Sequence, residues 1–203
     1  MPNICVFCGS ALGHAPAYRE AAEALGRAIA RRGWGLVYGG ATVGLMGAVA
    51  DAALAEGGNV TGVIPTALVN RELAHHGVTD LRIVSSMHER KLLMAAMSDA
   101  FISLPGGVGT LDELFEMLTW TVLHIHDKPS ALLDVDGYYD SLRTFLDRSV
   151  DDGFLHAAVR DGLLVDTDPD ALLATVEVGW SPEVRARAAN DPGAPPPGHR
   201  QDP

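Results

Sequence analysis

A run of small and rigid residues, 105–109 with the sequence PGGVG, stands directly before Thr110-Leu111-Asp112-Glu113. The second segment has the pattern of a capping box, in which Thr110 caps a helix and the Glu113 carboxylate reaches back to the Thr110 N–H. A cap needs no glycines before it. Glycine lets the backbone come close to a ligand, and a helix N-terminus offers free N–H groups and a partial positive charge. Glu113 therefore has two interpretations, helix capping and ligand chemistry, and the pattern leaves both open.

Two cations, Arg90 and Lys91, stand early in a helix that we expect over 87–98. The partial positive charge of a helix N-terminus disfavours cations at this place. Either an anionic ligand or solvent must offset that cost, and both interpretations fit the residues. Lys91 and Lys128 are the only lysines of the chain. Residues 86–89 form a second capping box in front of the same helix.

Two more glycine-rich turns, 8–10 (CGS) and 39–47 (GGATVGLMG), each follow an expected strand and precede an expected helix. Ligands of open α/β sheets bind outside the carboxyl ends of the strands, where all three turns would lie. Any single turn is also explained as a tight strand-to-helix connection. Together the turns predict a site for a phosphate-sized anion. The residues expected around it in the first two turns are Gly9, Ser10, Gly39, Gly40 and Gly44.

Neither standard nucleotide fingerprint is present. A Walker loop needs Gly-Lys followed by Ser or Thr, and no lysine stands near a glycine-rich turn. The dinucleotide pattern needs Gly-x-Gly-x-x-Gly after the first strand, whereas the 39–47 turn reads Gly-Gly-x-x-x-Gly-x-x-Gly. ATP hydrolysis and NAD chemistry are therefore disfavoured.

Short apolar runs alternate along the chain with longer amphipathic segments. The runs predicted as strands are 3–7, 35–38, 59–64, 81–84, 100–104 and 130–134. The segments predicted as helices are 16–32, 44–56, 87–98, 110–126, 138–152 and 169–178. This alternation predicts βαβ units, and near-continuous apolar strands are typical of a sheet covered on both faces. The predicted fold is an α/β, Rossmann-like, doubly wound parallel sheet with helices on both faces.

The composition, with 47% hydrophobic and 20% charged residues, is typical of a globular domain with a full apolar core. Residues 1–180 are expected to form one domain and 181–203 an extension, of which 191–203, with five prolines and two glycines, is expected to be disordered. A net charge of −11 argues against a general affinity for nucleic acid. No run has the length of a membrane span and no signal peptide is seen, so we expect a cytoplasmic protein without a membrane partner.

The cysteines and histidines do not predict a separate redox or metal site. Cys5 and Cys8 are expected to be reduced thiols in the core or a loop, with redox use as the minor alternative. The eight histidines form no recognised ligand set, so no metal is expected. The pair His75-His76 is expected at a loop surface rather than in a site.

Residues 87–91 (MHERK), followed by 105–113, resemble the LOG ("Lonely Guy") family of cytokinin riboside 5′-monophosphate phosphoribohydrolases. Segments 5–10, 37–40 with 44–47, 62–65, 118–120 and 136–139 fit the same family, so the resemblance covers roughly 3–155. The two motifs are specific in combination. One departure is Ala41, where the family often has a third glycine, and its methyl group narrows the room beside a phosphate.

The resemblance implies hydrolysis of an N6-modified adenosine monophosphate to the free base and ribose 5-phosphate, without a cofactor. It implies that Arg90 and Glu113 are the catalytic pair. The residues that it implies in substrate contact are Glu72, Arg90, Lys91, Gly107, Val108, Gly109, Thr110, Leu111, Asp112, Glu113 and Thr119. Glu113 would stabilise the positive charge that grows on the ribose, or align or deprotonate water.

The resemblance also implies a homodimer whose site is partly completed by the partner chain. The expected helix 110–126 carries more apolar side chains than one sheet face needs. Burial on two sides within one chain explains them equally well. These side chains are Leu111, Leu114, Phe115, Leu118, Val122 and Ile125.

Two other functions compete with this hydrolase. A non-catalytic nucleotide or cofactor carrier could use the same fold, since a fold alone does not decide function, but a carrier need not keep the pair Arg90 and Glu113. Relatives have also been labelled lysine decarboxylases. A Schiff-base lysine would have to be Lys91 or Lys128, and no pyridoxal-phosphate site surrounds either. The sequence does not separate plain adenine from its N6-prenylated form.

Overall fold

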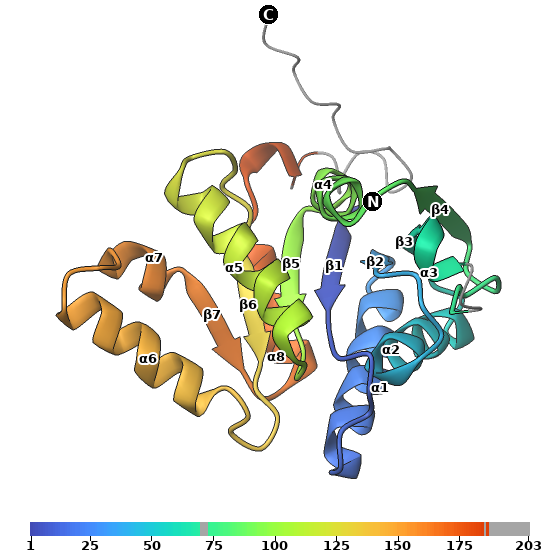
Figure 1. Ribbon diagram of the computed structural model, residues 1–203, viewed down its shortest axis with the longest axis horizontal. Coiled ribbons are helices and arrows are strands. Elements are labelled where there is room, and N and C mark those ends of the chain that lie inside the picture. Colours follow the sequence, from blue (N-terminus) through green and yellow to red (C-terminus); the bar gives the residue numbers. More distant parts are fainter. Residues whose placement is uncertain (70–72, 185, 187–203) are drawn as a thin grey trace, which may run out of the picture.

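The computed structural model describes residues 1–69, 73–184 and 186, and these form one open parallel sheet with helices on both sides (Figure 1). The order of the strands in the sheet is β4-β3-β2-β1-β5-β6-β7. The strands are β1 (Asn3–Phe7), β2 (Gly35–Tyr38), β3 (Val60–Pro65), β4 (Asp80–Val84), β5 (Ala100–Ser103), β6 (Ser130–Leu133) and β7 (Leu163–Asp166). This is the predicted doubly wound α/β fold.

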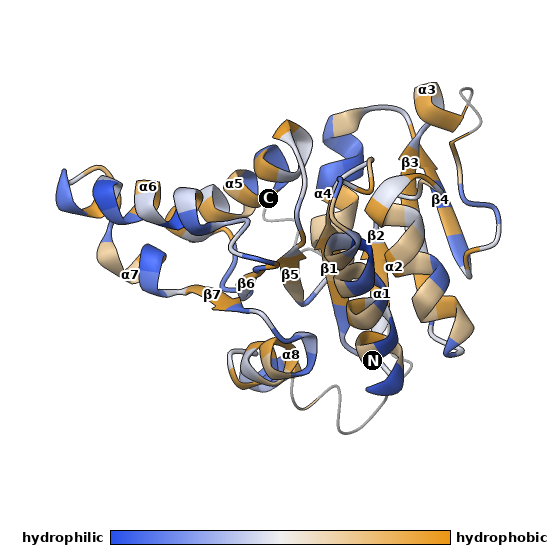
Figure 2. Ribbon diagram, turned by 90° about the horizontal axis from the view of Figure 1, so that it is seen from below, coloured by the Kyte–Doolittle hydropathy of each residue, from blue (hydrophilic) through white to orange (hydrophobic). Residues whose placement is uncertain are grey.

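The longer helices divide between the two faces of the sheet, as the predicted fold requires. Helices α1 (Pro16–Arg31), α2 (Gly44–Ala55) and α8 (Pro169–Val178) share one apolar core with the strands. Helices α4 (Met87–Met97), α5 (Val108–Val122) and α6 (Asp140–Asp151) supply the other face, and Figure 2 shows α5 and α8 on opposite sides of the sheet. Two short helices, α3 (Thr66–Val69) and α7 (Ala157–Asp161), complete the described elements.

Continuous burial explains why the central strands consist of apolar residues. In β1, β2, β5 and β6 nearly every residue is buried, because helices cover both faces. Small residues let α1 and α2 approach closely. A Cβ atom on Gly26 of α1 would lie 2.2 Å from the Val49 carbonyl oxygen of α2, so glycine is required at this crossing.

The element boundaries differ from the predicted ones by a few residues, and three short elements were not predicted. Helices α3 and α7 and strand β7 each have only four or five residues, too few to show a helical or strand period. Of the predicted extension 181–203, the structure describes 181–184 and 186, and segment 191–203 lies outside the described residues. Among the helices described, none combines the length and apolar character needed to cross a membrane.

Candidate active site

Three turns meet at the carboxyl edge of the sheet, where the strand order reverses between β1 and β5. They follow β1, β2 and β5, which are neighbours in the sheet. The Gly9 N–H donates to the Pro105 carbonyl (3.1 Å), and the Leu45 N–H donates to the Gly9 carbonyl (3.0 Å). The first turn is therefore hydrogen-bonded to both others. The sequence placed the three turns at this edge, and the structure brings them into contact.

A cavity of about 410 Å³ opens between these turns, a size usual for small-molecule sites. Its lining includes most of the residues predicted for the site: Gly9, Ser10, Gly39, Arg90, Gly107, Val108, Gly109, Thr110, Asp112 and Glu113. The remaining lining residues are Cys8, Ala41, Val43, Met46, Leu68, Leu73 and Met87. Five predicted residues, Gly40, Gly44, Lys91, Leu111 and Thr119, are not part of the lining, and Glu72 lies outside the described residues.

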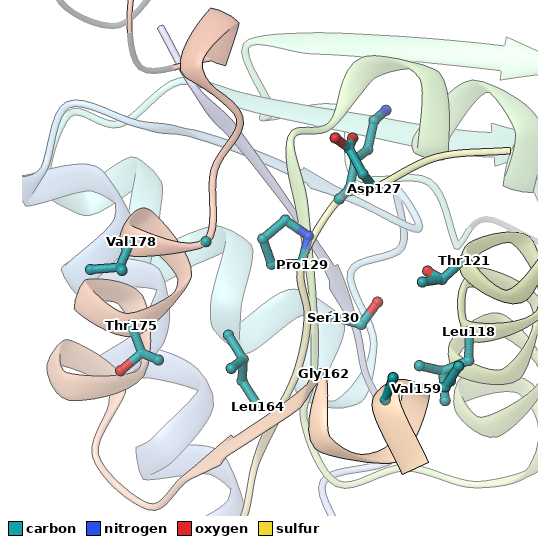
Figure 3. Close-up of a pocket in the computed structure, with 13 residues that line it drawn as sticks. Leu118, Thr121, Asp127, Pro129, Ser130, Val159, Gly162, Leu164, Thr175 and Val178 are labelled. Carbon is teal, nitrogen blue, oxygen red and sulfur yellow. The ribbon is translucent and has the colours of Figure 1, made fainter. Parts of the chain in front are cut away.

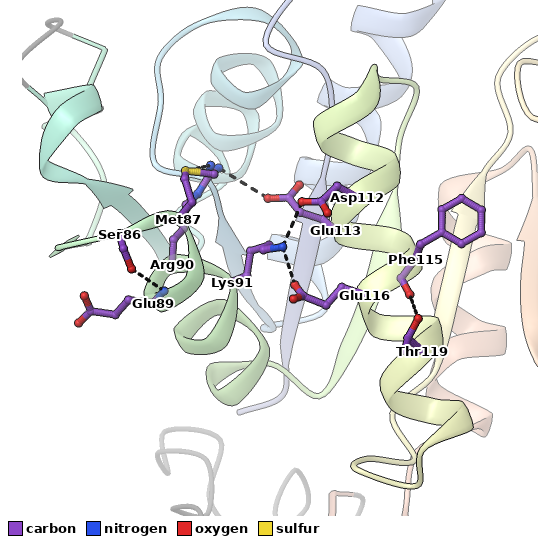
Figure 4. Close-up of polar contacts among 10 residues, drawn as sticks. All are labelled: Ser86, Met87, Glu89, Arg90, Lys91, Asp112, Glu113, Phe115, Glu116 and Thr119. Atoms are coloured by element: carbon purple, nitrogen blue, oxygen red, sulfur yellow. Dashed lines mark hydrogen bonds and ion pairs between the residues drawn. The ribbon is translucent and has the colours of Figure 1, made fainter.

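Arg90 and Glu113 face each other across the cavity, from α4 and α5 (Figure 4). Arg90 Nη2 lies 3.8 Å from Glu113 Oε1, and the two residues are 8% and 9% exposed. The Arg90 guanidinium lies over Gly39, where a Cβ atom would be 1.9 Å from Nη2. The first glycine of the 39–47 turn therefore makes room for the arginine. Arg90 Nε is buried and has no hydrogen-bond partner within the described part of the chain, so the guanidinium has unused donor capacity.

Burial dominates the acid–base behaviour of Glu113. It raises the pKa of this carboxyl group to about 7, even though the nearby charge of Arg90 lowers it. Asp112 and Glu116 add smaller effects that raise the pKa, and Lys91 adds one that lowers it. Near neutral pH both protonation states of the carboxyl group are therefore populated, and a perturbed group in a cavity is typical of catalytic sites.

Helix α5 begins three residues earlier than the capping box predicts. Its N-cap is Gly107, and Thr110 lies within the first turn. The Thr110 side chain packs against Gly106, where a Cβ atom would be only 2.1 Å from Oγ1. The capping interpretation of Thr110 and Glu113 is therefore wrong. The Glu113 carboxylate points to Arg90 instead, so its partner in the structure is a cation from α4 and not the backbone of its own helix.

The second predicted capping box behaves differently. Ser86 is the N-cap of α4 and its Oγ accepts from the Glu89 N–H (3.1 Å), as predicted. The Glu89 carboxylate binds Ser85 rather than Ser86, accepting from its N–H (2.7 Å) and its hydroxyl (2.6 Å). Half of the predicted reciprocal pair is thus present.

The N-terminus of α5 presents unused donors to the cavity. Among the described residues, the N–H groups from Gly107 to Thr110 have no backbone acceptor. Gly107 and Gly109 have open space around their Cα atoms, with nothing within 4 Å of an added Cβ atom. The glycines of this turn therefore clear room above a helix N-terminus, which is the arrangement that binds anions.

Lys91 bridges α4 to α5 instead of facing the cavity. Its Nζ lies 3.1 Å from both Asp112 Oδ2 and Glu116 Oε2 (Figure 4). These carboxylates raise the pKa of the amine, although burial alone would lower it. Thr119 lies further along α5, where its hydroxyl donates to the Phe115 carbonyl (2.7 Å). In a single chain these two predicted contacts thus lie beside the cavity, not in it.

The apolar part of the cavity was missed by sequence reasoning. Met46, Leu68 and Leu73 come from three separate segments, and apolar residues in such places look like ordinary core or loop. His75, expected at a loop surface, is buried instead. It binds Asp51 of α2 through Nε2 (2.9 Å), and its N–H donates to the Gly40 carbonyl (2.9 Å). The segment that carries Leu73 is thereby attached to the 39–47 turn.

A second cavity, of about 370 Å³, lies near the amino ends of β6 and β7 (Figure 3). Its lining is mostly apolar and includes Leu118, Val159, Leu164 and Val178. It is at the edge of the sheet opposite to the usual ligand edge. Within the described ranges, no group of three or more His, Cys, Asp or Glu residues is placed to hold a metal ion.

Comparisons with known proteins identify the family of this chain. The family described as "Possible lysine decarboxylase" matches residues 46–176. A cytokinin riboside 5′-monophosphate phosphoribohydrolase of Rhodococcoides fascians is 48% identical over 175 residues, which are 86% of this chain and 88% of the relative. An Arabidopsis thaliana protein of the same name, LOG7, is 52% identical over 158 residues, or 78% of this chain and 73% of the relative. The chain belongs to the LOG family.

Solved structures share the fold of this LOG-family chain at lower identity. The molybdenum cofactor binding protein from Rippkaea orientalis is 24% identical, with a TM-score of 0.68 over 87% of this chain and 96% of that chain. The Moco carrier protein from Chlamydomonas reinhardtii is also 24% identical, with a TM-score of 0.67 over 92% and 98%. The likeness to these carriers extends to the fold alone.

The lysines and cysteines of this LOG-family chain, all within the described residues, are poorly placed for Schiff-base or redox chemistry. Lys91 Nζ is held by two carboxylates, Lys128 Nζ donates to the Ala95 carbonyl (2.8 Å), and neither lysine lines the cavity between the three turns, where a Schiff base would have to form. Cys5 and Cys8 are both buried free thiols. Burial raises the pKa of each thiol, which is the opposite of what a reactive cysteine needs.

Proposed function

We propose that this protein hydrolyses the N-glycosidic bond of a nucleoside 5′-monophosphate, releasing the free base and ribose 5-phosphate. The observation that carries the proposal is the buried pair of Arg90 and Glu113, 3.8 Å apart, beside a helix N-terminus with unused N–H donors. A carrier needs the donors but not the carboxylate. The names of relatives with 48–52% identity support the same activity.

The reaction breaks the bond between C1′ and the base nitrogen and forms a bond between C1′ and a water oxygen. One water proton ends on the base and the other remains on the new C1′ hydroxyl group. Positive charge grows on the ribose in the transition state, and a carboxylate beside C1′ stabilises it. We assign this role to ionised Glu113, which at its pKa of about 7 is also able to accept a proton from water.

Arg90 and the turns hold the rest of the substrate. The Arg90 charge favours the ionised form of Glu113, opposing the effect of burial. The phosphate group binds the N–H groups of the turn from Gly107 to Thr110, where the α5 dipole adds a favourable field. Ala41 lines the same cavity, so its methyl group narrows the space without closing it. Lys91, Thr119 and Glu72 are proposed as further substrate contacts on the family pattern.

We propose an N6-modified adenine as the base. The cavity has an apolar wall formed by Val43, Met46, Leu68, Leu73 and Met87. Burial of an apolar N6 substituent against this wall is worth roughly 25 cal/mol per Å² of apolar surface. Plain adenine lacks that contact.

We also propose that the protein is a cytoplasmic homodimer. Some of the apolar side chains of the predicted helix 110–126 are exposed to solvent in a single chain. Leu114 and Leu118 are buried, whereas Val122 and Ile125 are exposed, and Leu92 of neighbouring α4 is exposed as well. Exposed large apolar side chains are frequent at interfaces between subunits, and these three support the proposed dimer.

Base release from adenosine monophosphate and from its N6-isopentenyl analogue tests the proposal. Glu113→Gln and Arg90→Ala are each expected to lower kcat/KM by at least about 100-fold, because each removes charge stabilisation at the reacting centre. Glu56→Gln, an exposed carboxylate paired with Arg31, is the matched control and should behave as wild type. Full activity in either site variant would refute the catalytic assignment. The analogue should have the higher kcat/KM, and equal values would argue against the proposed base.

A further inference from the structure

Four consecutive carbonyl groups, 104–107, all accept hydrogen bonds within the protein, three of them from other segments and one from α5. The donors come from the turn after β6, the first turn and α5 itself. They are Tyr139 OH to the Leu104 carbonyl (2.6 Å), Gly9 N–H to Pro105 (3.1 Å), Tyr138 OH to Gly106 (2.6 Å) and Leu111 N–H to Gly107 (3.1 Å). All four oxygens are thus occupied within the protein.

This arrangement fixes the direction of the N–H groups. In a planar trans peptide the C=O and the following N–H point in opposite directions. A carbonyl held by a donor in the protein body therefore turns the next N–H away from that donor. For the Gly106–Gly107 peptide, the N–H that is turned away belongs to Gly107, a residue that lines the cavity.

Of the peptides in this segment, Gly106–Gly107 is the one flanked by glycine on both sides. Both of its residues lack a Cβ atom, so neither side chain restricts the backbone. Its N–H has no recorded acceptor among the described residues, and its carbonyl bonds to the Tyr138 hydroxyl. If this peptide turned over, it would present a carbonyl oxygen to the cavity in place of an N–H, and so repel an anion.

The Tyr138 ring is itself held in place. It packs edge-on against Tyr18 of α1 (centroids 5.7 Å apart) and against Tyr139 (5.1 Å). The Tyr139 backbone N–H donates to Asp134 Oδ1 (2.9 Å), which fixes the turn after β6. The Tyr138 hydroxyl is therefore presented to Gly106 by a supported ring, although the residue is 41% exposed.

We propose that Tyr138 is a positioning residue, which holds the Gly106–Gly107 peptide so that the Gly107 N–H binds the substrate phosphate. The inference rests on the proposed function for the identity of the substrate. Tyr138 acts through the backbone and need not touch substrate. Its loss should weaken phosphate binding and leave the chemical step at C1′ nearly unchanged.

Tyr139 provides a matched control, because its hydroxyl also donates to a backbone carbonyl of this segment, that of Leu104, two residues before Gly106. Its hydroxyl holds the Leu104 carbonyl at the end of β5, and the whole residue is buried. Removing that hydroxyl leaves a buried carbonyl unpaired, which lowers stability. It does not release the Gly106–Gly107 peptide. Tyr138→Phe should thus affect mainly ligand binding, whereas Tyr139→Phe should affect mainly stability.

The experiment measures KM and kcat for adenosine monophosphate, calorimetric binding of ribose 5-phosphate, and Tm, for wild type and both variants. For Tyr138→Phe we expect KM and the ribose 5-phosphate Kd to rise about tenfold, as for loss of one hydrogen bond to a charged group, with kcat changed less than about threefold. For Tyr139→Phe we expect a lower Tm and nearly unchanged KM and Kd.

Unchanged KM and Kd in Tyr138→Phe would overturn the inference, and so would equal changes of both in the two variants. A fall in kcat with unchanged KM would also overturn it, because the residue would then act on the reaction. Absence of base release by wild type would refute the proposed function instead. The ribose 5-phosphate measurement would still decide the role of Tyr138, since binding needs no turnover.

Discussion

Glu113 combines two requirements that oppose each other. Stabilising a positive ribose needs an ionised carboxylate, whereas burial favours the neutral acid. Burial raises the pKa to about 7, and Arg90 limits the rise. The residue therefore stands close to the point where both forms are populated at neutral pH, and its charge is sensitive to small changes around it.

This balance predicts a pH profile. If ionised Glu113 is required, kcat/KM should rise about tenfold per pH unit below the pKa of about 7 and level off above it. The substrate phosphate also titrates, with a pKa near 6. The Glu113→Gln variant separates the two, because its residual activity should keep only the limb due to phosphate. Identical profiles for wild type and variant would show that Glu113 does not control the rate.

The family resemblance predicted that Arg90 and Glu113 act together, and the structure places them 3.8 Å apart, but the other pairings of the site left no signal in the sequence. Arg90 and Glu113 stood out by the cost of a cation early in a helix and by the glycines before the carboxylate. The capping pattern at Thr110 pointed to the wrong partner for Glu113, because local spacing does not show that α4 packs beside α5. For Lys91 the same contact between helices supplied two carboxylate partners that no local pattern contains.

At the scale of elements, the long strands and helices were predicted because burial on two faces and amphipathic periodicity both leave clear patterns. The elements missed were short, and β7 lies at the edge of the sheet, where its residues are only partly buried. The residues at which helices begin were predicted less accurately. Helix α5 begins at Val108 without any side-chain cap, so the sequence offered no signal for its first turn.

Replacing glycine by alanine is expected to have opposite effects on stability in helices α1 and α5. Gly26→Ala in α1 should destabilise the protein by about 1–3 kcal/mol, because the overpacked Cβ would lie 2.2 Å from the Val49 oxygen and helix propensity returns at most about 1 kcal/mol. Gly109→Ala in α5 has open space and should be neutral or stabilise by up to about 1 kcal/mol. Urea unfolding of both variants measures the difference. A stabilised Gly26→Ala protein would mean that the two helices separate freely.

At the scale of the whole molecule, the topology determines where chemistry is possible. Strands β1, β2 and β5 are adjacent although they are far apart in the chain, so three turns converge on one cavity. That convergence followed from the predicted fold class. The apolar wall did not, since Leu68 and Leu73 reach the cavity only through the packing of the segment after β3.

The exposed apolar side chains at the end of α5 predict how the chain assembles. Ile125→Glu should convert the proposed homodimer toward monomer, because a charge replaces apolar contact at the interface. Phe145→Glu on α6 is the matched control, with 62% exposure against 60% for Ile125. Light scattering after size-exclusion chromatography gives the masses. A monomeric wild type would refute the dimer, and a dimeric Ile125→Glu protein would place the interface elsewhere.

The four occupied carbonyls of the 104–107 segment also bear on how this site tolerates sequence change. Every residue except proline has a backbone N–H, so a position of the turn with room for a side chain is free to vary, as at Val108, which is 86% exposed, whereas Gly106 has no room for a Cβ atom. The orientation of the turn depends in addition on groups outside it, the hydroxyls of Tyr138 and Tyr139 and the N–H of residue 9. A survey of variants that scores only residues near the ligand would overlook them, and an engineer who grafts this turn onto another protein would have to transfer those supports as well.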